Sequence, residues 1–291
     1  MTAQILNGDE IAKQYRERVA QDIALRTQQG YRPPMLAVVL VGEDPASQIY
    51  VRNKRNACEY VGINAVDYSL SHNISQIELI ALINKLNKDP TIDGILVQLP
   101  LPYQINVTEI VESINPNKDV DGFHPYNLGR LAQGRPYLRP CTPAGVMLLL
   151  EHTQVKMPGL KATVVGTSNI VGLPMILELI RAGCTVTTCN KKTRDLAAEI
   201  GAADVMVVAT GNPGLIKGSW IKPGSIVIDV GMNRLPDGHL VGDVEFATAK
   251  ERAAWITPVP GGVGPMTITS LLSNTLLANI NAQLDLKLSH S

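Results

Sequence analysis

Residues 161–180 read KATVVGTSNIVGLPMILELI, and they predict a strand, a glycine-rich turn and a helix in direct succession. The strand is expected over 162–165 and the helix over 170–182. More strands are expected at 185–189, 204–209 and 225–230. Strands that alternate with helices across short loops form parallel sheets with helices on both faces. The second half of the chain is therefore predicted to be an α/β domain.

The first half of the chain shows the same alternation of helices and strands. Asp44 and Pro45 form an N-cap followed by a proline at the first helical position, and Gly62 is suited to end that helix. Ser75 and Glu78 have capping-box spacing at the start of another helix. Strands are expected at 35–41, 63–70 and 92–98, an initial helix over 11–23 and a closing helix over 265–280. The whole chain is thus predicted to be a two-domain α/β protein.

The composition limits the classes of function open to this protein. The 291 residues include 26 Lys and Arg against 26 Asp and Glu, so no overall positive charge attracts a nucleic acid. The four cysteines have no CxxC spacing and the five histidines form no close pair, which argues against a metal site. The N-terminus lacks a signal-peptide pattern, and the apolar runs are too short to span a bilayer. A cytoplasmic protein with no membrane or nucleic-acid partner is expected.

The turn GTSNIVGLP, residues 166–174, is a candidate phosphate site because it follows a strand and opens a helix. Its spacing is not GxGxxG, so a purely structural turn is the alternative. The next strand ends in NKKTR, residues 190–194, where NAD-binding proteins carry an acidic residue. A basic cluster suits the 2′-phosphate of NADP. The alternative for this cluster is a solvated turn before a helix capped by Thr193.

A candidate acid–base pair lies in the segment VGEDPASQIYVRNK, residues 41–54. Tyr50 and Lys54 are four residues apart, hence on one face of the predicted helix. A lysine used in acid–base chemistry needs its pKa lowered toward roughly 7 to 8, which a pocket with a tyrosine hydroxyl could achieve. An exposed helix pair is the alternative. Short-chain dehydrogenases place Tyr-x-x-x-Lys after the dinucleotide turn, whereas the order here is reversed, so substrate and cofactor are expected to meet across an interdomain cleft.

Three further stretches fall where loops are expected: QLPLP at 98–102, PNKDVDGF at 116–123 and TPVPGGVGPMTI at 257–268. Gln98 offers both a donor and an acceptor at the end of a buried strand. Asp121 supplies a carboxylate that can accept paired hydrogen bonds from an amino-heterocycle. Taken separately, Gln98 and Asp121 are more readily explained by structural roles than by functional ones, but their combination points to a binding site.

In this order, and over nearly the whole chain, these segments resemble the bifunctional methylenetetrahydrofolate dehydrogenase/methenyltetrahydrofolate cyclohydrolase family. The stretches TPAG at 142–145 and IDVGMNR at 228–234 add to the match. The resemblance implies an NADP-linked oxidation of 5,10-methylenetetrahydrofolate to the methenyl compound, followed by its hydrolysis to 10-formyltetrahydrofolate. A monofunctional dehydrogenase is the alternative within enzymes. A non-catalytic periplasmic-type binding module is the alternative from another class.

The resemblance also implies roles for individual residues. Lys54 would be the catalytic acid/base, Tyr50 and Gln98 would orient it and the folate, and Asp121 would bind the pterin edge. The expected substrate-binding residues are Tyr50, Lys54, Gln98, Leu99, Asp121, Pro260, Gly261 and Gly262. The expected cofactor-binding residues are Gly166, Thr167, Ser168, Asn190, Lys191, Thr210, Gly211 and Met232. No metal site is expected.

Two positions depart from the family pattern. Many members have Arg where this chain has Thr167, and His-Ser where it has Asn190 and Lys191. Those residues usually help to hold the 2′-phosphate. Lys191 or Lys192 is therefore expected to take over this task in the present chain.

The resemblance further implies an N-terminal α/β three-layer domain and a Rossmann-like, doubly wound, parallel-sheet NADP-binding domain. Residues 1–140 plus 267–291 are expected to form the folate-binding catalytic domain, and residues 141–266 the NADP-binding domain. The C-terminal helix would thus return to the first domain. The family also implies a homodimer formed through the NADP-binding domains.

Overall fold

The computed structural model describes residues 2–289 and divides into two compact units. The three-stranded unit consists of Gln14–Cys141 and Ile268–Ser291, and the six-stranded unit consists of Met1–Lys13 and Thr142–Thr267. The sequence predicts that residues 1–13 belong to the other domain. They group with the six-stranded unit because a short strand within them joins its sheet.

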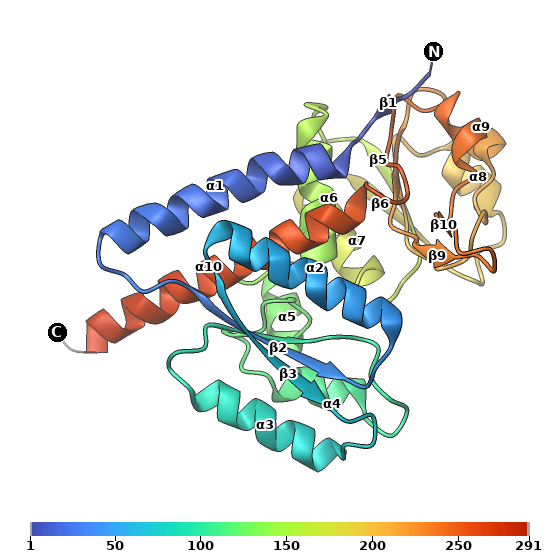
Figure 1. The fold of residues 1–291 in the computed structure, drawn as a ribbon. Helices are drawn as coiled ribbons and strands as arrows, with labels where there is room; N and C mark the ends of the chain where they lie inside the picture. Colours follow the sequence, from blue (N-terminus) through green and yellow to red (C-terminus); the bar gives the residue numbers. More distant parts are fainter. Residues whose placement is uncertain (1, 290–291) are drawn as a thin grey trace. The chain divides into compact units, whose positions relative to one another are not determined.

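The three-stranded unit is built in three layers (Figure 1). Its parallel sheet has the order β3-β2-β4. Leu36 and Val38 of the central strand pack into one apolar core, while Ala37 and Val39 pack into a second core on the opposite face. The first core also holds side chains of α1, α2 and α10, and the second holds those of α3 and α4. The elements are β2 (Met35–Val41), β3 (Asn64–Leu70), β4 (Gly94–Val97), α1 (Gly8–Gln28), α2 (Pro45–Val61), α3 (Gln76–Lys88), α4 (Val107–Ser113), α5 (Pro125–Ala132) and α10 (Val263–Ser289).

The caps predicted from the sequence fix the ends of α2 and α3. The Asp44 carboxylate accepts a hydrogen bond from the Ser47 N–H at 2.7 Å, which starts α2. Gly62 ends that helix in the left-handed conformation, with φ of 84°. Both hydrogen bonds of the Ser75–Glu78 capping box are present at the start of α3. Helix α2 therefore carries the candidate pair Tyr50 and Lys54 on adjacent turns.

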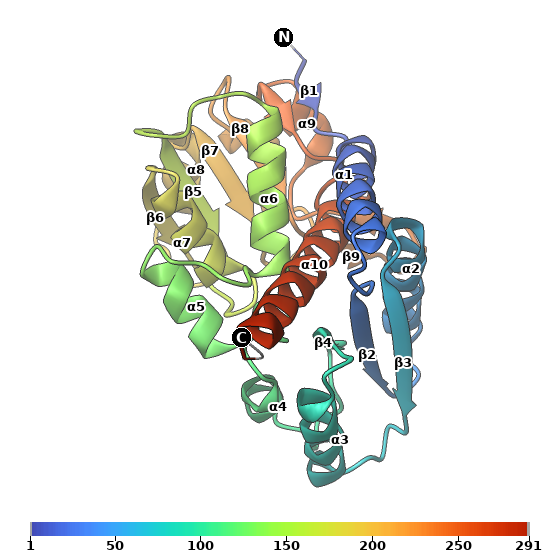
Figure 2. The same cartoon turned by 90° about the vertical axis from the view of Figure 1, so that its left-hand side faces the viewer.

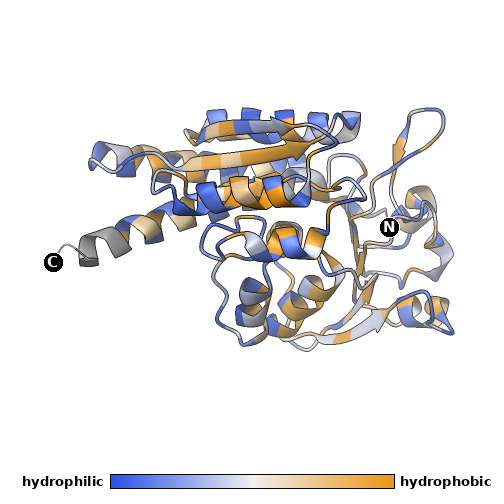
Figure 3. Ribbon diagram, turned by 90° about the horizontal axis from the view of Figure 1, so that it is seen from below, coloured by the Kyte–Doolittle hydropathy of each residue, from blue (hydrophilic) through white to orange (hydrophobic). Residues whose placement is uncertain are grey.

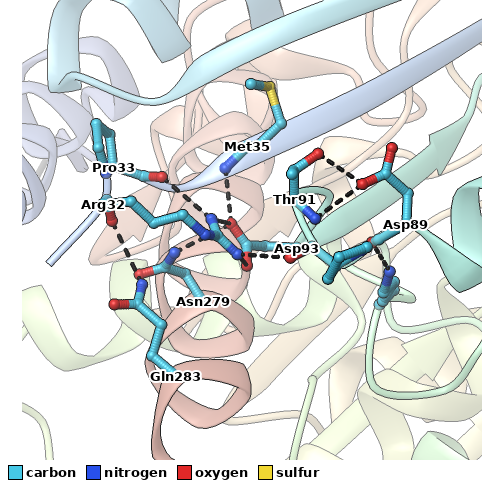
Figure 4. Close-up of polar contacts among 10 residues, drawn as sticks. Arg32, Pro33, Met35, Asp89, Thr91, Asp93, Asn279 and Gln283 are labelled. Carbon is cyan, nitrogen blue, oxygen red and sulfur yellow. Dashed lines mark hydrogen bonds and ion pairs between the residues drawn. The ribbon is translucent and has the colours of Figure 1, made fainter. Parts of the chain in front are cut away.

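A buried carboxylate fastens α10 to the sheet of the three-stranded unit (Figure 4). Asp93 is 2% exposed and precedes β4. It accepts hydrogen bonds from both terminal nitrogens of Arg32, at 2.7 and 2.8 Å, and from the Met35 N–H at 2.8 Å. Asn279 of α10 donates to the same carboxylate at 3.0 Å. The expected return of the C-terminal helix to the first domain is thus confirmed by direct contacts.

The six-stranded sheet is parallel throughout and has the order β1-β11-β8-β7-β5-β6. Its strands are β1 (Gln4–Ile5), β5 (Lys161–Val165), β6 (Thr185–Cys189), β7 (Val205–Val208), β8 (Ile226–Asp229) and β11 (Trp255–Ile256). The chain runs from β5 to β6 and then crosses to the other side of β5, where β7 and β8 lie side by side (Figure 2). Ligands of open α/β sheets bind beyond the carboxyl ends of strands at such a reversal. The turn after β5 and the loop after β7 occupy that position.

Both faces of this sheet are covered. Met206 and Val208 of β7 belong to an apolar core shared with α8 and α9, and the alternate residues Val205 and Val207 are also fully buried. The remaining elements of the unit are α6 (Cys141–His152), α7 (Gly172–Arg181), α8 (Leu196–Gly201), α9 (Phe246–Lys250), the 3₁₀ helix η1 (Gly218–Trp220), β9 (Asn233–Arg234) and β10 (Leu240–Val241). The two-domain α/β prediction with a doubly wound sheet is therefore confirmed.

Hydrophobic segments lie on strands and also on helices, where they alternate with hydrophilic ones (Figure 3). All four residues of β4, β7 and β8 are buried, as expected of strands covered on both faces. Within residues 2–289, no helix has the length and apolar character that a membrane crossing requires.

Candidate active site

Lys54 and Gln98 form the centre of the candidate site in the three-stranded unit. Lys54 lies on α2 and is only 7% exposed. Its Nζ donates a hydrogen bond to Gln98 Oε1 at 3.0 Å. Gln98 directly follows β4, and its Nε2 donates to the Leu99 carbonyl at 2.6 Å. The backbone thus orients the amide so that its oxygen faces the lysine, and the structure brings three predicted site residues together.

Tyr50 lies one helical turn before Lys54 on α2 and is partly buried. Burial raises the pKa of its phenol above the ordinary value. The hydroxyl therefore keeps its proton at neutral pH and can donate a hydrogen bond.

Asp121 lies near enough to Lys54 for the two charges to interact. Burial raises the pKa of Asp121 to about 6; the positive charge of Lys54 lowers it, and the negative charge of Asp119 adds to the rise. The Asp121 carbonyl accepts a hydrogen bond from the Cys141 N–H at 3.1 Å, which fixes the backbone. Gly122 then turns the chain with φ of 77°, and a Cβ there would lie 2.5 Å from the Pro140 nitrogen. Only glycine fits this position beside the carboxylate.

Asp119 also belongs to this site, and the sequence reasoning did not single it out. Its Oδ2 accepts hydrogen bonds from the His124 N–H at 2.8 Å and from Asn127 Nδ2 at 2.9 Å. Burial raises the pKa of Asp119. Leu99, Asp119 and Asp121 line one small pocket. The repeated aspartate of KDVDGF was the signal that could have indicated both carboxylates.

The predicted residues of the proline–glycine loop lie in the six-stranded unit. Gly261 has φ of 92°, and its carbonyl accepts a hydrogen bond from the Gly8 N–H at 2.8 Å. A Cβ at Gly8 would overlap the Gly262 carbonyl. Gly261 and Gly262 therefore pack against the start of α1, and the folate-binding role of Pro260, Gly261 and Gly262 remains a prediction.

The glycine-rich turn after β5 has the shape of a phosphate cradle. Gly166 has φ of 111°, and a Cβ there would collide with the Ala209 carbonyl after β7. A Cβ at Gly172, the first residue of α7, would collide with the Gly166 carbonyl. Thr167 and Ser168 are exposed between these two glycines. The backbone therefore approaches closely on both sides and leaves an open surface at the start of a ten-residue helix.

The basic turn after β6 is held by its own polar groups. The Asn190 N–H donates to Thr193 Oγ1 at 2.9 Å, and Asn190 Oδ1 accepts from the Lys192 N–H at 2.9 Å. Asp195, and not Thr193, caps α8. Lys191 and Lys192 are exposed, and within residues 2–289 neither ammonium group bonds to another side chain. Their charges are therefore open to an anion.

Thr210 and Gly211 follow β7, on the other side of the chain reversal from the basic turn. The N–H groups of both residues donate to the Asp243 carboxylate. Met232 lies in the loop after β8 and is 39% exposed. The structure thus gathers the predicted cofactor residues at the carboxyl edge of one sheet.

The doubly wound sheet, with a glycine turn at its chain reversal, defines a nucleotide-binding α/β protein, and the separate unit with a buried Lys–Gln–Asp set adds a second site. Residues 6–121 match the catalytic domain of the tetrahydrofolate dehydrogenase/cyclohydrolase family. Residues 140–283 match the NAD(P)-binding domain of the same family. The chain belongs to the tetrahydrofolate dehydrogenase/cyclohydrolase family, as the sequence resemblance predicted.

Solved structures of similar proteins span almost the same length. The bifunctional FolD methylenetetrahydrofolate dehydrogenase/cyclohydrolase of Campylobacter jejuni is 47% identical, with a TM-score of 0.93 over 96% of this chain and 99% of that one. The Trypanosoma brucei enzyme, solved with NADP and an inhibitor, is 38% identical, with a TM-score of 0.92 over 97% and 98%. The bifunctional Thermoplasma acidophilum enzyme is 36% identical, with a TM-score of 0.90 over 96% and 99%.

Proposed function

We propose that this chain is a bifunctional enzyme of one-carbon folate metabolism. It oxidises 5,10-methylenetetrahydrofolate to 5,10-methenyltetrahydrofolate with NADP, and it hydrolyses the methenyl compound to 10-formyltetrahydrofolate. Both domains of the family match this chain, and the similar proteins of C. jejuni and T. acidophilum are described as bifunctional. The bifunctional assignment is therefore favoured over a monofunctional dehydrogenase.

The observation that carries the proposal is the buried Lys54, held by Gln98 and facing the charge of Asp121. Lys54 is 7% exposed and has lost most of its contact with water. Burial of a charged group raises the free energy of the fold unless other polar groups replace the water. An amide oxygen and a nearby carboxylate fix its position. This arrangement suits a group that must meet one substrate atom.

The hydrolytic step requires two proton transfers, and Lys54 can serve both. Water adds to the methenyl carbon, and the unprotonated amine of Lys54 takes the proton that the water loses. When the bond from this carbon to one ring nitrogen breaks, the ammonium returns a proton to that nitrogen, and the hydroxyl on the carbon releases its proton to solvent as the formyl C=O forms. Tyr50, whose pKa is raised by burial, keeps its hydroxyl proton and can hold the folate in place. Asp121, with Leu99 beside it, accepts hydrogen bonds from the pterin edge.

The residues at the edge of the six-stranded sheet fit NADP. The collision that a Cβ at Gly166 would cause with the Ala209 carbonyl supports this assignment, because a glycine there lets the backbone approach a pyrophosphate closely. Gly166, Thr167 and Ser168 would hold the phosphates, Asn190 with Lys191 and Lys192 would hold the 2′-phosphate, and Met232 would lie beside a ring. The bound NADP would accept the hydride from the methylene carbon.

The proposal is tested by mixing the protein with 5,10-methylenetetrahydrofolate and NADP while NADPH and methenyl absorbances are followed together. A bifunctional enzyme forms NADPH, while the methenyl signal rises and then decays. With a monofunctional dehydrogenase, the methenyl absorbance decays only at the rate of spontaneous hydrolysis in buffer. A binding module gives neither signal.

The proposal also includes a homodimer formed through the NADP-binding unit and a location in the cytoplasm. The dimer is expected from the family resemblance, and light scattering on the purified chain would show a mass twice that of the 31.4 kDa monomer. A monomeric mass at micromolar concentration would contradict it.

A further inference from the structure

Two buried carboxylates lie behind the loops that follow β7 and β8, and the sequence reasoning assigned neither. Asp229 ends β8 and is 4% exposed; Asp243 follows β10 and is fully buried. A Cβ at Gly231 would collide with the Asp243 carboxylate, and one at Gly242 would collide with the Asp229 carboxylate. Glycines thus flank both groups, so the space around each carboxylate is closed.

Asp243 connects two loops that the chain supplies separately. Its Oδ2 accepts hydrogen bonds from the Thr210 N–H at 2.6 Å, the Thr210 hydroxyl at 2.8 Å and the Gly211 N–H at 3.1 Å. Its Oδ1 accepts from Asn233 Nδ2 at 2.9 Å. The first loop follows β7, and the second contains Met232 and leads into Asn233, the first residue of β9. One carboxylate therefore sets the separation of the two loops that carry Thr210, Gly211 and Met232.

Asp229 holds Asp243 in place through the backbone. Its Oδ1 accepts from the Asp243 N–H at 3.1 Å and from the Gly231 N–H at 2.9 Å, and its Oδ2 accepts from the Val244 N–H at 2.9 Å. Backbone donors on both sides of the Asp243 residue are thus anchored to a strand end. This leaves the Asp243 side chain little freedom to move toward or away from the loops.

The contacts also decide which atoms of the two loops remain for a ligand. The N–H groups of Thr210 and Gly211, and the Thr210 hydroxyl proton, are already donated to Asp243. Within residues 2–289, Asp243 makes no ion pair with a lysine, arginine or histidine, so these dipoles and Asn233 are what stabilise its charge. The loops can therefore offer a ligand their carbonyl oxygens and their shape, but not these donors.

We propose that Asp243 is a positioning residue for NADP, which acts by joining the loop at Thr210 and Gly211 to the loop at Met232 and Asn233. This inference rests on the proposed function, because it takes these loops to line the NADP site. Asp243 itself touches no substrate. Its removal should change cofactor affinity while it leaves the folate-only reaction intact.

The test compares Asp243→Asn with the wild type in two assays. Asparagine keeps the shape of the side chain but turns an N–H group toward donors that need an acceptor. The KM for NADP in the dehydrogenase reaction is expected to rise about tenfold, which corresponds to about 1.4 kcal/mol. Hydrolysis of supplied methenyltetrahydrofolate, measured without NADP, should stay within about twofold because that reaction uses no cofactor.

Asp237→Asn is the matched control, because Asp237 is exposed in the turn between β9 and β10. It should leave both assays unchanged. If Asp243→Asn does not fold, Asn233→Ala removes the 2.9 Å bond to Oδ1, together with a 3.4 Å bond to the Val241 carbonyl, and should still raise the KM for NADP with normal hydrolysis. An unchanged KM for NADP, or an equal fall of both activities, would overturn the inference.

A direct titration with NADP separates this inference from the proposed function. If the wild type binds NADP but shows neither activity, the proposed function fails, and the dissociation constant of Asp243→Asn still reports on positioning. If the wild type shows both activities and Asp243→Asn binds NADP normally, only the positioning inference fails.

Discussion

Lys54 and Asp121 place opposite charges close together in a partly buried environment. Loss of water strengthens their attraction, and it also raises the free energy of either charge left alone. Gln98 offsets part of this cost because its amide oxygen accepts a hydrogen bond from Lys54. A substitution at any of the three residues therefore changes the charge balance as well as the chemistry.

Lys54→Met is expected to lower cyclohydrolase activity by at least about a hundredfold, because a positioned acid–base group contributes that much or more. The measurement is the decay of methenyl absorbance after mixing. Lys85→Met on α3 is the matched control, since Lys85 is exposed, and it should hydrolyse at the wild-type rate. Near-normal hydrolysis by Lys54→Met would refute the assignment of Lys54.

The kcat/KM for the folate substrate is expected to fall below about pH 6, where Asp121 takes up a proton. A protonated carboxyl loses the paired acceptors that the pterin edge requires, so the fall should approach tenfold per pH unit. In Asp121→Asn this acidic limb should disappear, with a lower plateau at neutral pH. If kcat/KM of Asp121→Asn still falls below about pH 6, a group other than Asp121 causes the pH dependence.

Partners that lie close along the chain were predictable from the sequence, whereas distant partners were not. Tyr50 and Lys54 were predictable as a pair because one turn of a well-capped helix joins them. Asp243 was not, because the residues it holds lie 33 and 10 positions away along the chain. A carboxylate whose partners are mostly backbone N–H groups leaves no pairing signal in the sequence, since every residue except proline offers such a donor.

At the scale of elements, α10 depends on a polar anchor as well as on its apolar face. The Asp93 carboxylate accepts hydrogen bonds from Arg32, in the segment before β2, and from Asn279 of α10 (Figure 4). A buried carboxylate with this many donors holds each donor in one place. The position of α10 against the three-stranded sheet is thus fixed in register.

Asp93→Ala is expected to lower the free energy of unfolding of the three-stranded unit by about 3 kcal/mol, because it removes the carboxylate that Arg32 pairs with and leaves the Asn279 amide without its acceptor. Urea denaturation followed by circular dichroism would measure the loss. Asp67→Ala, which breaks the exposed 3.4 Å pair with Arg55, should cost less than about 1 kcal/mol. Equal losses in the two variants would contradict the anchoring role.

The turn between β6 and α8 should determine the choice between NADP and NAD. Replacement of Lys191 and Lys192 by alanine is expected to raise the KM for NADP about tenfold, since two exposed charges that we propose bind the 2′-phosphate are lost. The KM for NAD should change little. Replacement of Lys85 and Lys88 by alanine removes the same charge from α3 and should affect neither constant. An unchanged KM for NADP would show that these lysines do not replace the usual family residues.

Most long elements were predictable because local chemistry sets their ends. The strand predicted at 35–41 has those bounds in the structure, and the Ser75–Glu78 box starts α3. The strands β1 and β11 were missed because each has two residues, which is too few for a periodic pattern. They exist because each pairs with a partner distant in sequence.

At the scale of the whole molecule, a neutral chain buries several carboxyl groups. Burial raises the pKa of Asp229 to about 6, with a further rise from Asp243, although three backbone N–H donors oppose the shift. An acid whose pKa is raised on folding stabilises the fold below its unfolded pKa, and that stabilisation is lost as pH rises through the folded pKa. The six-stranded unit should therefore lose stability between about pH 4 and 6 through this group.

Asp229→Asn should remove that dependence. The free energy of unfolding of the wild type, relative to the variant, is expected to fall by up to about 3 kcal/mol between pH 4 and 6.5. Denaturant curves at several pH values, read on the transition of the six-stranded unit, would give the difference. A difference that stays constant with pH would show that Asp229 does not titrate in this range.

Residues near the N-terminus pair with residues that are synthesised much later. Strand β1 at residues 4–5 pairs with β11 at residues 255–256, and Arg32 shares its carboxylate with Asn279. At about 5–20 residues per second, the early segments must wait on the order of ten seconds or longer on the ribosome for these partners. During that time the apolar side chains of the early segments lack the residues that cover them in the folded protein. The six-stranded unit cannot complete its sheet before β11 has left the exit tunnel, and the three-stranded unit cannot complete its core before α10 has left it. A nascent chain that stops before residue 255 therefore leaves both units incomplete.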